Sequence, residues 1–225
     1  MTDRSLYRLM AWLSPSYPVG AFSYSHGLEW AIEAHDLRRP QAIADWIEDI
    51  LRFGAGRSDA ILFAHAHRAI GREDEDALFE AIELARAFQS SRERALESLA
   101  QGEAFLRATR AAWPIPALDR LTTDLGEIAY PVAVGVAAAG HGIALMPALQ
   151  AYLQSFAANL VSAAVRLIPL GQTAGLRLVA ALEPVIEEVR EDAEAAPLTM
   201  LGGCALRADL ASMNHETQET RLFRT

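Results

Sequence analysis

The chain of 225 residues is 52% hydrophobic and carries a formal net charge of −9. Its length suffices for a substantial buried core, and its apolar content excludes a disordered chain. The acidic balance argues against a nucleic-acid-binding protein, because such proteins concentrate positive charge on the phosphate backbone. All 20 basic residues are arginine, which excludes a standard P-loop nucleotidase and enzymes that need a lysine amine.

Two features bear on where the chain works. Cys204 is the single cysteine, so no intramolecular disulfide can form, and we expect a cytoplasmic protein. No secretory signal is visible. Residues 128–165 contain no charged side chain, but Pro131, Gly140 and Pro147 interrupt the stretch and much of it is alanine. We therefore expect a buried pair of helices there, and no membrane span.

Apolar spacing is helical along the first half of the chain. Leu6, Leu9 and Leu13 predict a short amphipathic N-terminal helix. A second helix begins at Pro40, which suits a first turn, and ends at the glycines near residue 54. The next helix follows, with Ser58 or Asp59 as its predicted N-cap. The acidic run at residues 73–76 then opens a further helix, where it complements the macrodipole.

The second half continues in the same way. Ser90 and Glu93 predict a capping box ahead of a long helix that runs to Trp113. Gly102 within that helix predicts a close contact with another helix. Residues 130–140 predict a helix of small residues for tight packing. A late helix is expected to kink or restart at Pro184.

No segment shows strand-like alternation, and no hairpin turn is visible. The start and stop signals predict one all-α domain over residues 1–225, with about nine or ten helices and no sheet. Residues 209–225 are expected to form a C-terminal helix and a docking tail.

The stretch SPSYPVGAFSYSHGLEW, residues 14–30, raises the question of a catalytic serine. Ser23 or Ser25 would be the nucleophile and His26 its base. The spacing does not match a GxSxG elbow, and adjacent side chains on a helix point about 100° apart. A shaped turn is the better interpretation: Pro18 fixes φ, Gly20 lets the backbone turn, and the hydroxyls cap the next helix.

Three histidines have spacings that raise the question of a metal site. His65 and His67 are two residues apart, so their side chains diverge by about 200° on a helix. His215 and Glu219 could supply two ligands from one helix face, which is fewer than a structural metal site needs. We therefore favour a hydrogen bond at the helix surface for His215. A helical metal-dependent hydrolase using His215 and Glu219 stays as the alternative function.

The closing RLFRT has two interpretations. Terminal residues commonly fray. Arginine and aromatic side chains are, however, the usual anchors of protein interfaces, so we favour a docking tail.

Five stretches together resemble the urease accessory protein UreF family over nearly the whole chain. They are SPSYPVGAFSYSHGLE, FQSSRERALESLAQGEAFLR, YPVAVGVAAAGHGI, NLVSAAVRLIPLGQTAG and DLASMNHETQETRLFRT. The resemblance implies an all-α homodimer that is not an enzyme. It implies that the protein binds UreD/UreH, recruits the GTPase UreG and modulates GTP hydrolysis during nickel insertion into apo-urease. Nickel and GTP would act through these partners, with no cofactor bound directly.

The resemblance also implies partner-binding residues at both ends of the chain, and it places the two groups near each other. The C-terminal group is His215, Glu216, Gln218, Arg221, Leu222, Phe223 and Arg224, and the N-terminal group is Pro18, Gly20, Phe22, Tyr24, Ser25 and Gly27.

Three positions depart from the family pattern. A basic residue is expected at Asn214, and an aromatic–serine pair at Glu219 and Thr220. Arg221 and Arg224 are also candidates for an arginine finger that acts on GTP.

Overall fold

A computed structural model describes residues 2–35, 37–121 and 125–224 of the chain. Every regular element in these residues is helical, which confirms the all-α prediction. Of the twelve α-helices in the described part, only α2 with eight residues and α7 with four are shorter than ten residues. This agrees with the nine or ten helices expected. The elements are α1 (Asp3–Trp12), η1 (Ala21–Ser23), α2 (Leu28–His35), α3 (Pro40–Phe53), α4 (Ala55–Arg72), α5 (Glu75–Ala87), α6 (Arg92–Ala112), α7 (Pro116–Asp119), α8 (Tyr130–Gly140), α9 (Leu145–Leu167), α10 (Gln172–Ala181), α11 (Glu183–Ala195), η3 (Leu198–Met200) and α12 (Leu206–His215).

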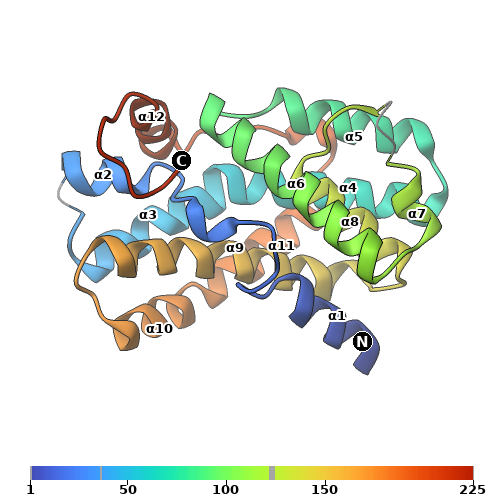
Figure 1. Ribbon diagram of the computed structural model, residues 1–225, viewed down its shortest axis with the longest axis horizontal. Helices are drawn as coiled ribbons and strands as arrows, with labels where there is room; N and C mark the ends of the chain where they lie inside the picture. Colours follow the sequence, from blue (N-terminus) through green and yellow to red (C-terminus); the bar gives the residue numbers. More distant parts are fainter. Residues whose placement is uncertain (1, 36, 122–124, 225) are drawn as a thin grey trace.

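Helix α4 lies at the centre of the fold and packs against α3, α5, α8, α9 and α11 (Figure 1). Its closest neighbour is α8, in which every residue from Pro131 to Ala138 is buried. Alanine, glycine and valine leave room for two helix backbones to approach, so the predicted tight packing of α8 is confirmed.

Gly102 in α6 marks a second close approach. A Cβ atom at this position would lie 1.9 Å from the carbonyl oxygen of Ile128. Ile128 comes just before α8, so any larger residue at position 102 would push α6 away from the start of that helix. The close contact predicted for Gly102 is therefore present, and it is made with backbone.

Two predicted helix starts are wrong. Ser58 and Asp59 do not cap α4, because α4 begins at Ala55 and only Gly54 separates it from α3. Both side chains are buried inside α4. At the start of α6 the cap is Ser91, whose hydroxyl accepts a hydrogen bond from the backbone N–H of Arg94 at 3.1 Å. Glu93 does not complete a capping box and points into the protein.

The C-terminal third is close to what the sequence predicts. The chain restarts at Pro184, which lies in the first turn of α11, immediately after α10. The last helix begins at Leu206, three residues before the predicted start, and ends at His215. No helix in the described residues is long and apolar enough to cross a membrane.

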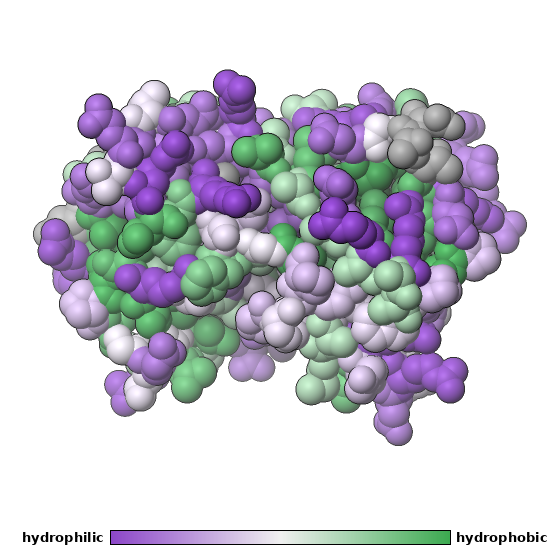
Figure 2. Space-filling view, viewed as in Figure 1, coloured by the Kyte–Doolittle hydropathy of each residue, from purple (hydrophilic) through white to green (hydrophobic). Residues whose placement is uncertain are grey.

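The N-terminal helix and the C-terminal segment differ in how closely they lie against the body of the protein (Figure 1). Helix α1 projects from the body, whereas the C-terminus returns over α2 beside α12 (Figure 1). Figure 2 shows hydrophobic side chains gathered over the part of this face that holds α2, α9 and α10. The chain that follows α12 crosses the edge of this region.

Candidate functional site

The candidate site is the place where the residues after α12 dock onto the protein. We call residues 216–224 the tail and residues 14–27 the turn segment. Helix α12 packs against α2 and α6. Ser212 in α12 and Ser91 at the start of α6 share a hydrogen bond of 2.6 Å between their hydroxyls.

Gly27 sets how closely α2 approaches α12. Its φ is 73°, a left-handed conformation that favours glycine. A Cβ atom there would lie 2.4 Å from the backbone nitrogen of Ser212. Only glycine allows both the left-handed φ and this close approach, so Gly27 determines how α12 packs against the start of α2.

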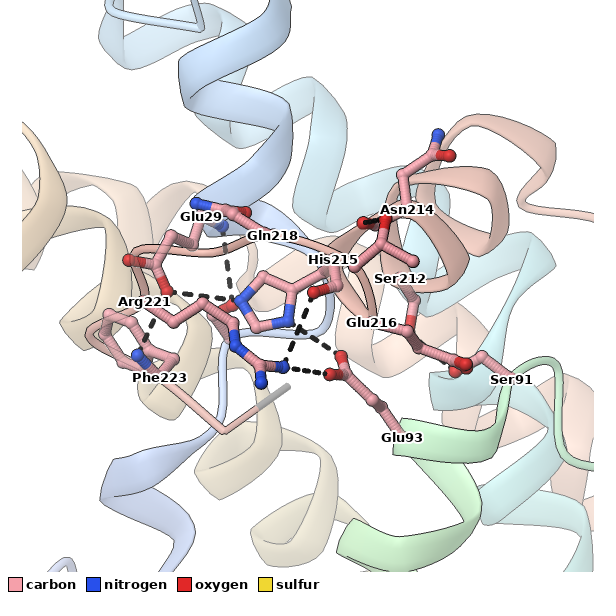
Figure 3. Close-up of polar contacts among 12 residues, drawn as sticks. Glu29, Ser91, Glu93, Ser212, Asn214, His215, Glu216, Gln218, Arg221 and Phe223 are labelled. Atoms are coloured by element: carbon pink, nitrogen blue, oxygen red, sulfur yellow. Dashed lines mark hydrogen bonds and ion pairs between the residues drawn. The ribbon is translucent and has the colours of Figure 1, made fainter.

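His215 ends α12 inside the protein, fully buried between two carboxylates (Figure 3). Its Nδ1 lies 2.7 Å from Oε2 of Glu93, and its Nε2 lies 3.2 Å from Oε2 of Glu29. Arg221 donates to the other oxygen of Glu93 at 2.9 Å. Burial raises the pKa of Glu93, while His215 and Arg221 oppose the rise. We call Glu29, Glu93, His215 and Arg221 the carboxylate–histidine cluster.

Glu29 also holds the backbone of the tail. Its Oε1 accepts the N–H of Leu222 at 2.7 Å, and its Oε2 accepts the N–H of Phe223 at 3.0 Å. The next residue, Arg224, donates its N–H to the carbonyl of Ser23 at 2.8 Å. The tail is therefore fixed by backbone bonds that do not depend on its side chains.

Earlier tail residues add polar contacts. The backbone N–H of Arg92, in the first turn of α6, donates to Glu216 at 3.0 Å. Gln218 donates to Glu33 of α2 at 2.9 Å and to the carbonyl of Thr220 at 3.0 Å. The tail thus touches both helices that flank α12.

Arg166, at the end of α9, joins the turn segment to the tail. Its guanidinium carbon lies 3.7 Å from the ring centroid of Phe22 and 4.4 Å from that of Phe223. Such stacking on aromatic faces is favourable for arginine. Phe223 is buried, whereas Phe22 is 62% exposed and Leu222 is 78% exposed. Phe22 and Leu222 therefore stay in solvent, and Phe22 lies beside the Arg166 guanidinium.

His26 belongs to a second buried polar group. Its Nε2 lies 2.9 Å from Glu97 and 2.7 Å from Arg94, both on α6. Gln101 also donates to Glu97 at 2.9 Å. Burial would raise the pKa of Glu97, but Arg94 and His26 together hold it at about 2. Burial lowers the pKa of His26, and Arg94 lowers it further.

This second group does not form a serine active site. The Ser25 hydroxyl accepts from the backbone N–H of Glu29 at 3.4 Å, in the first turn of α2. The Nε2 of His26 faces Glu97 and Arg94. The predicted capping role of a turn-segment hydroxyl is therefore present at Ser25.

Asp59 of α4 lies near the same group. It accepts a hydrogen bond from the hydroxyl of Tyr152 at 3.1 Å, and burial raises its pKa to about 6. A cavity of about 210 Å³ lies beside it, lined among others by Trp12, Phe22 and His26. The turn segment therefore lines this cavity and also contacts the tail.

The metal site considered for His215 is not formed. Glu219 lies four residues beyond the end of α12, so the two side chains do not share one helix face. Both ring nitrogens of His215 already face carboxylates, and Glu219 is exposed. The described residues contain no cluster of three or more histidine, cysteine or acidic side chains that could hold a metal ion. His65 and His67 bond to separate backbone carbonyls, those of Ala196 and Ile143.

The structure brings most of the expected residues of the two chain ends together. Pro18 and Gly20 lie in the turn before η1 and are exposed. Tyr24 is buried, and burial raises its pKa while the neighbouring Arg224 opposes the rise. The three departures, Asn214, Glu219 and Thr220, are all exposed.

The sequence analysis did not identify three residues that hold the tail in place: Glu29, Glu93 and Arg166. Each lies in a stretch that had been identified, but a local pattern could not show its partner. One signal was available, since Glu29 and Glu33 are four residues apart and therefore share a face of α2.

Comparison of the sequence with known proteins identifies the family of this chain. A model of the UreF family matches residues 37–183. A urease accessory protein UreF from Xanthobacter autotrophicus is 54% identical over 222 residues, covering 98% of this chain and 91% of that protein. The corresponding protein from Rhodopseudomonas palustris strain BisB18 is 52% identical, covering 98% of this chain and 92% of its own. One from Methylobacterium sp. strain 4-46 is 53% identical, covering 96% and 87%. The chain belongs to the UreF family of urease accessory proteins.

Proposed function

We propose that this chain is a non-catalytic scaffold for urease maturation in the cytoplasm. With a UreD/UreH-type partner, it recruits the GTPase UreG and modulates GTP hydrolysis as nickel is inserted into apo-urease. Nickel and GTP act through these partners. The family supports the maturation role, because its members are named accessory proteins of urease. We also propose that the scaffold works as a homodimer.

One observation supports the tail and turn segment as the docking surface. Their backbones are bonded firmly to the body, yet Phe22 and Leu222 stay exposed. Exposed apolar side chains on an ordered backbone bind at low entropic cost, and a neighbouring arginine suits an interface anchor. Arg166 between Phe22 and Phe223 supplies that cation.

The contacts of Arg221, one of the two candidates for an arginine finger, do not support that role. Arg221 already donates to Glu93, so its guanidinium is engaged within the chain. Arg224 is exposed. A scaffold that presents an ordered surface does not need either residue to reach GTP.

The test is co-purification of UreG with the chain and its UreD/UreH partner. We expect Leu222→Asp to abolish capture of UreG or of the UreD/UreH partner, because it places a charge within the apolar surface. Leu176→Asp is the matched control, since Leu176 on α10 is equally solvent-facing at 71% exposed. Normal assembly with Leu222→Asp and with removal of residues 221–225 would exclude the tail from the mechanism.

A second measurement separates recruitment from catalysis. Single-turnover GTP hydrolysis by the assembled complex is expected to be unchanged in Arg224→Ala once complex formation is complete. A fall of about 10³-fold or more in that rate would identify an arginine finger and contradict the purely structural role.

A further inference from the structure

The cavity beside Asp59 is large enough for a small organic molecule. Its volume is about 210 Å³, whereas an apolar cavity of about 150 Å³ is enough to hold benzene. Pro15 and Phe22 line the cavity and are exposed, so it reaches the surface at the turn segment. Every residue that the structure places on the lining lies between Trp12 and Ser162, so the site does not involve the tail.

Aromatic side chains form much of the cavity wall. They are Trp12, Tyr17, Phe22, Tyr130, Tyr152 and Phe156. Some of these rings also contact one another, and the ring centroids of Tyr130 and Tyr152 lie 5.6 Å apart. Ligand sites in proteins are typically concave and lined by apolar and aromatic side chains, with a few polar groups that fix the orientation of the ligand. A wall of this kind suits a flat apolar body.

Four buried polar atoms on the lining residues have no hydrogen-bond partner within the described part of the chain. They are Nε1 of Trp12, Nδ1 of His26, Nε of Arg94 and Oγ of Ser98. All four residues are at most 5% exposed. Buried polar side-chain atoms are nearly always hydrogen-bonded, so four such atoms around one cavity point to a partner that binds inside it.

The chemistry of these atoms defines the ligand. The indole Nε1–H of Trp12 and the guanidinium Nε–H of Arg94 can only donate, so the ligand must carry an acceptor. An anion gains little, because Arg94 is already paired with Glu97 and Asp59 adds a second acid to the lining. A cation would be repelled by Arg94 and would leave both N–H donors without a partner. A neutral acceptor is the remaining choice.

We propose that this cavity is a binding site for a small neutral molecule with a flat apolar body and a carbonyl-type acceptor, such as an aromatic amide. The N–H groups of Trp12 and Arg94 donate to the acceptor, and the aromatic wall surrounds the body. The carboxyl of Asp59 can accept the N–H of an amide. This site lies within the chain and does not depend on the proposed scaffold role.

The experiment titrates benzamide into the full chain labelled with ¹⁵N. The indole N–H signal of Trp12, assigned with Trp12→Phe, should shift and saturate at about 1 mM benzamide, an affinity typical of so small a ligand. Trp46 is the internal control. Its Nε1 is also buried without a partner among the described residues, but its side chain is not part of the cavity lining.

Two further probes test the chemistry of the ligand. Toluene has a similar ring without an acceptor, and benzoate adds a negative charge. Both should bind more weakly than benzamide, by up to about tenfold for each hydrogen bond lost. Toluene or benzoate binding as tightly as benzamide would overturn the proposal. So would the absence of a saturable shift at Trp12, which is the result expected if the cavity takes up water only.

Two variants locate the site. Trp12→Phe keeps an aromatic ring but removes the donor, so benzamide should bind about twofold to tenfold more weakly while toluene is unaffected. Binding to this variant is followed at the backbone amides of Ser98 and Gln101, which also line the cavity. Ala158→Phe places a larger side chain on the wall and should weaken both probes. Unchanged benzamide binding in both variants would place the probe elsewhere and contradict the assignment.

Discussion

The guanidinium of Arg166 lies 4.4 Å from the ring of Phe223, although 57 positions separate the two residues in the chain (223 − 166). The same guanidinium lies 3.7 Å from the ring centroid of Phe22. One side chain from the end of α9 thus connects the turn segment to the tail, and the first prediction follows from it.

Replacing Arg166 should loosen the tail without unfolding the protein. A cation–π contact contributes about 0.5–2 kcal/mol, depending on how far it is desolvated. Arg166→Ala loses the contacts with both rings, so we expect faster proteolysis within residues 216–224. Arg166→Lys should restore part of the protection, because it keeps the charge but loses the flat stacking surface. Equal cleavage in all three proteins would show that the stacking does not hold the tail.

Glu29 should control hydrogen exchange at two tail amides. Its carboxylate accepts the N–H groups of Leu222 and Phe223, and a hydrogen bond to a charged group contributes about 1.5–3 kcal/mol. Glu29→Ala is therefore expected to raise exchange at both amides by at least tenfold. Glu33→Ala is the matched control on the same helix, because Glu33 contacts only the side chain of Gln218 in the tail. Similar exchange in the two variants would contradict the role of Glu29.

Asp59 should make stability depend on pH. Burial raises its pKa from 3.8 to about 6 in the folded protein. Its stabilising contribution is therefore complete below pH 3.8 and is lost as the pH rises through about 6. Above that pH, ionised Asp59 disfavours the fold by about 3 kcal/mol, because each tenfold change in proton affinity corresponds to about 1.4 kcal/mol.

Asp59→Asn keeps an acceptor for the Tyr152 hydroxyl and removes the titration. The free energy of unfolding of the variant, relative to the wild type, should increase between about pH 4.5 and about pH 7.5. Chemical denaturation at the two pH values measures this difference. A difference that is constant with pH would mean that Asp59 has an ordinary pKa in the folded protein.

Gly27 and Gly20 form a matched pair for backbone strain. Both have left-handed φ, of 73° and 77°. A Cβ atom at Gly20 meets nothing within 4 Å, whereas one at Gly27 would lie 2.4 Å from the backbone of Ser212. Gly20→Ala should lower the free energy of unfolding by about 1–2 kcal/mol, which is the strain alone. Gly27→Ala should cost clearly more and should also mobilise the tail, because α12 must shift. Equal losses in thermal denaturation would contradict the close approach.

Much of the helical framework follows from local rules. Pro40 and Pro184 lie in first turns, the small residues of α8 are buried, and Gly102 sits at a close approach, as predicted. These features depend on backbone restrictions and on spacing along a few turns, which are properties of the sequence itself. The motifs at the two ends of the chain also indicated the region of the site.

The partners of polar side chains did not follow from local rules. Glu93 satisfies the spacing of a capping box, yet its carboxylate binds His215 and Arg221. Asp59 satisfies the pattern of an N-cap, yet it is buried in the second turn of α4. In both cases a side chain had a local option and a distant one, and the distant one was made available by packing.

The sequence by itself therefore determined the all-α class, the places where helices begin at proline, and the family that its five motifs resemble. Only the tertiary structure decided that Glu29 carries the tail, that His215 lies between two acids and that Arg166 joins both chain ends. The physical reason is range: backbone geometry and helical periodicity act over a few residues. Hydrogen bonds and stacking contacts instead join any groups that burial brings together, and that burial is a property of the whole fold.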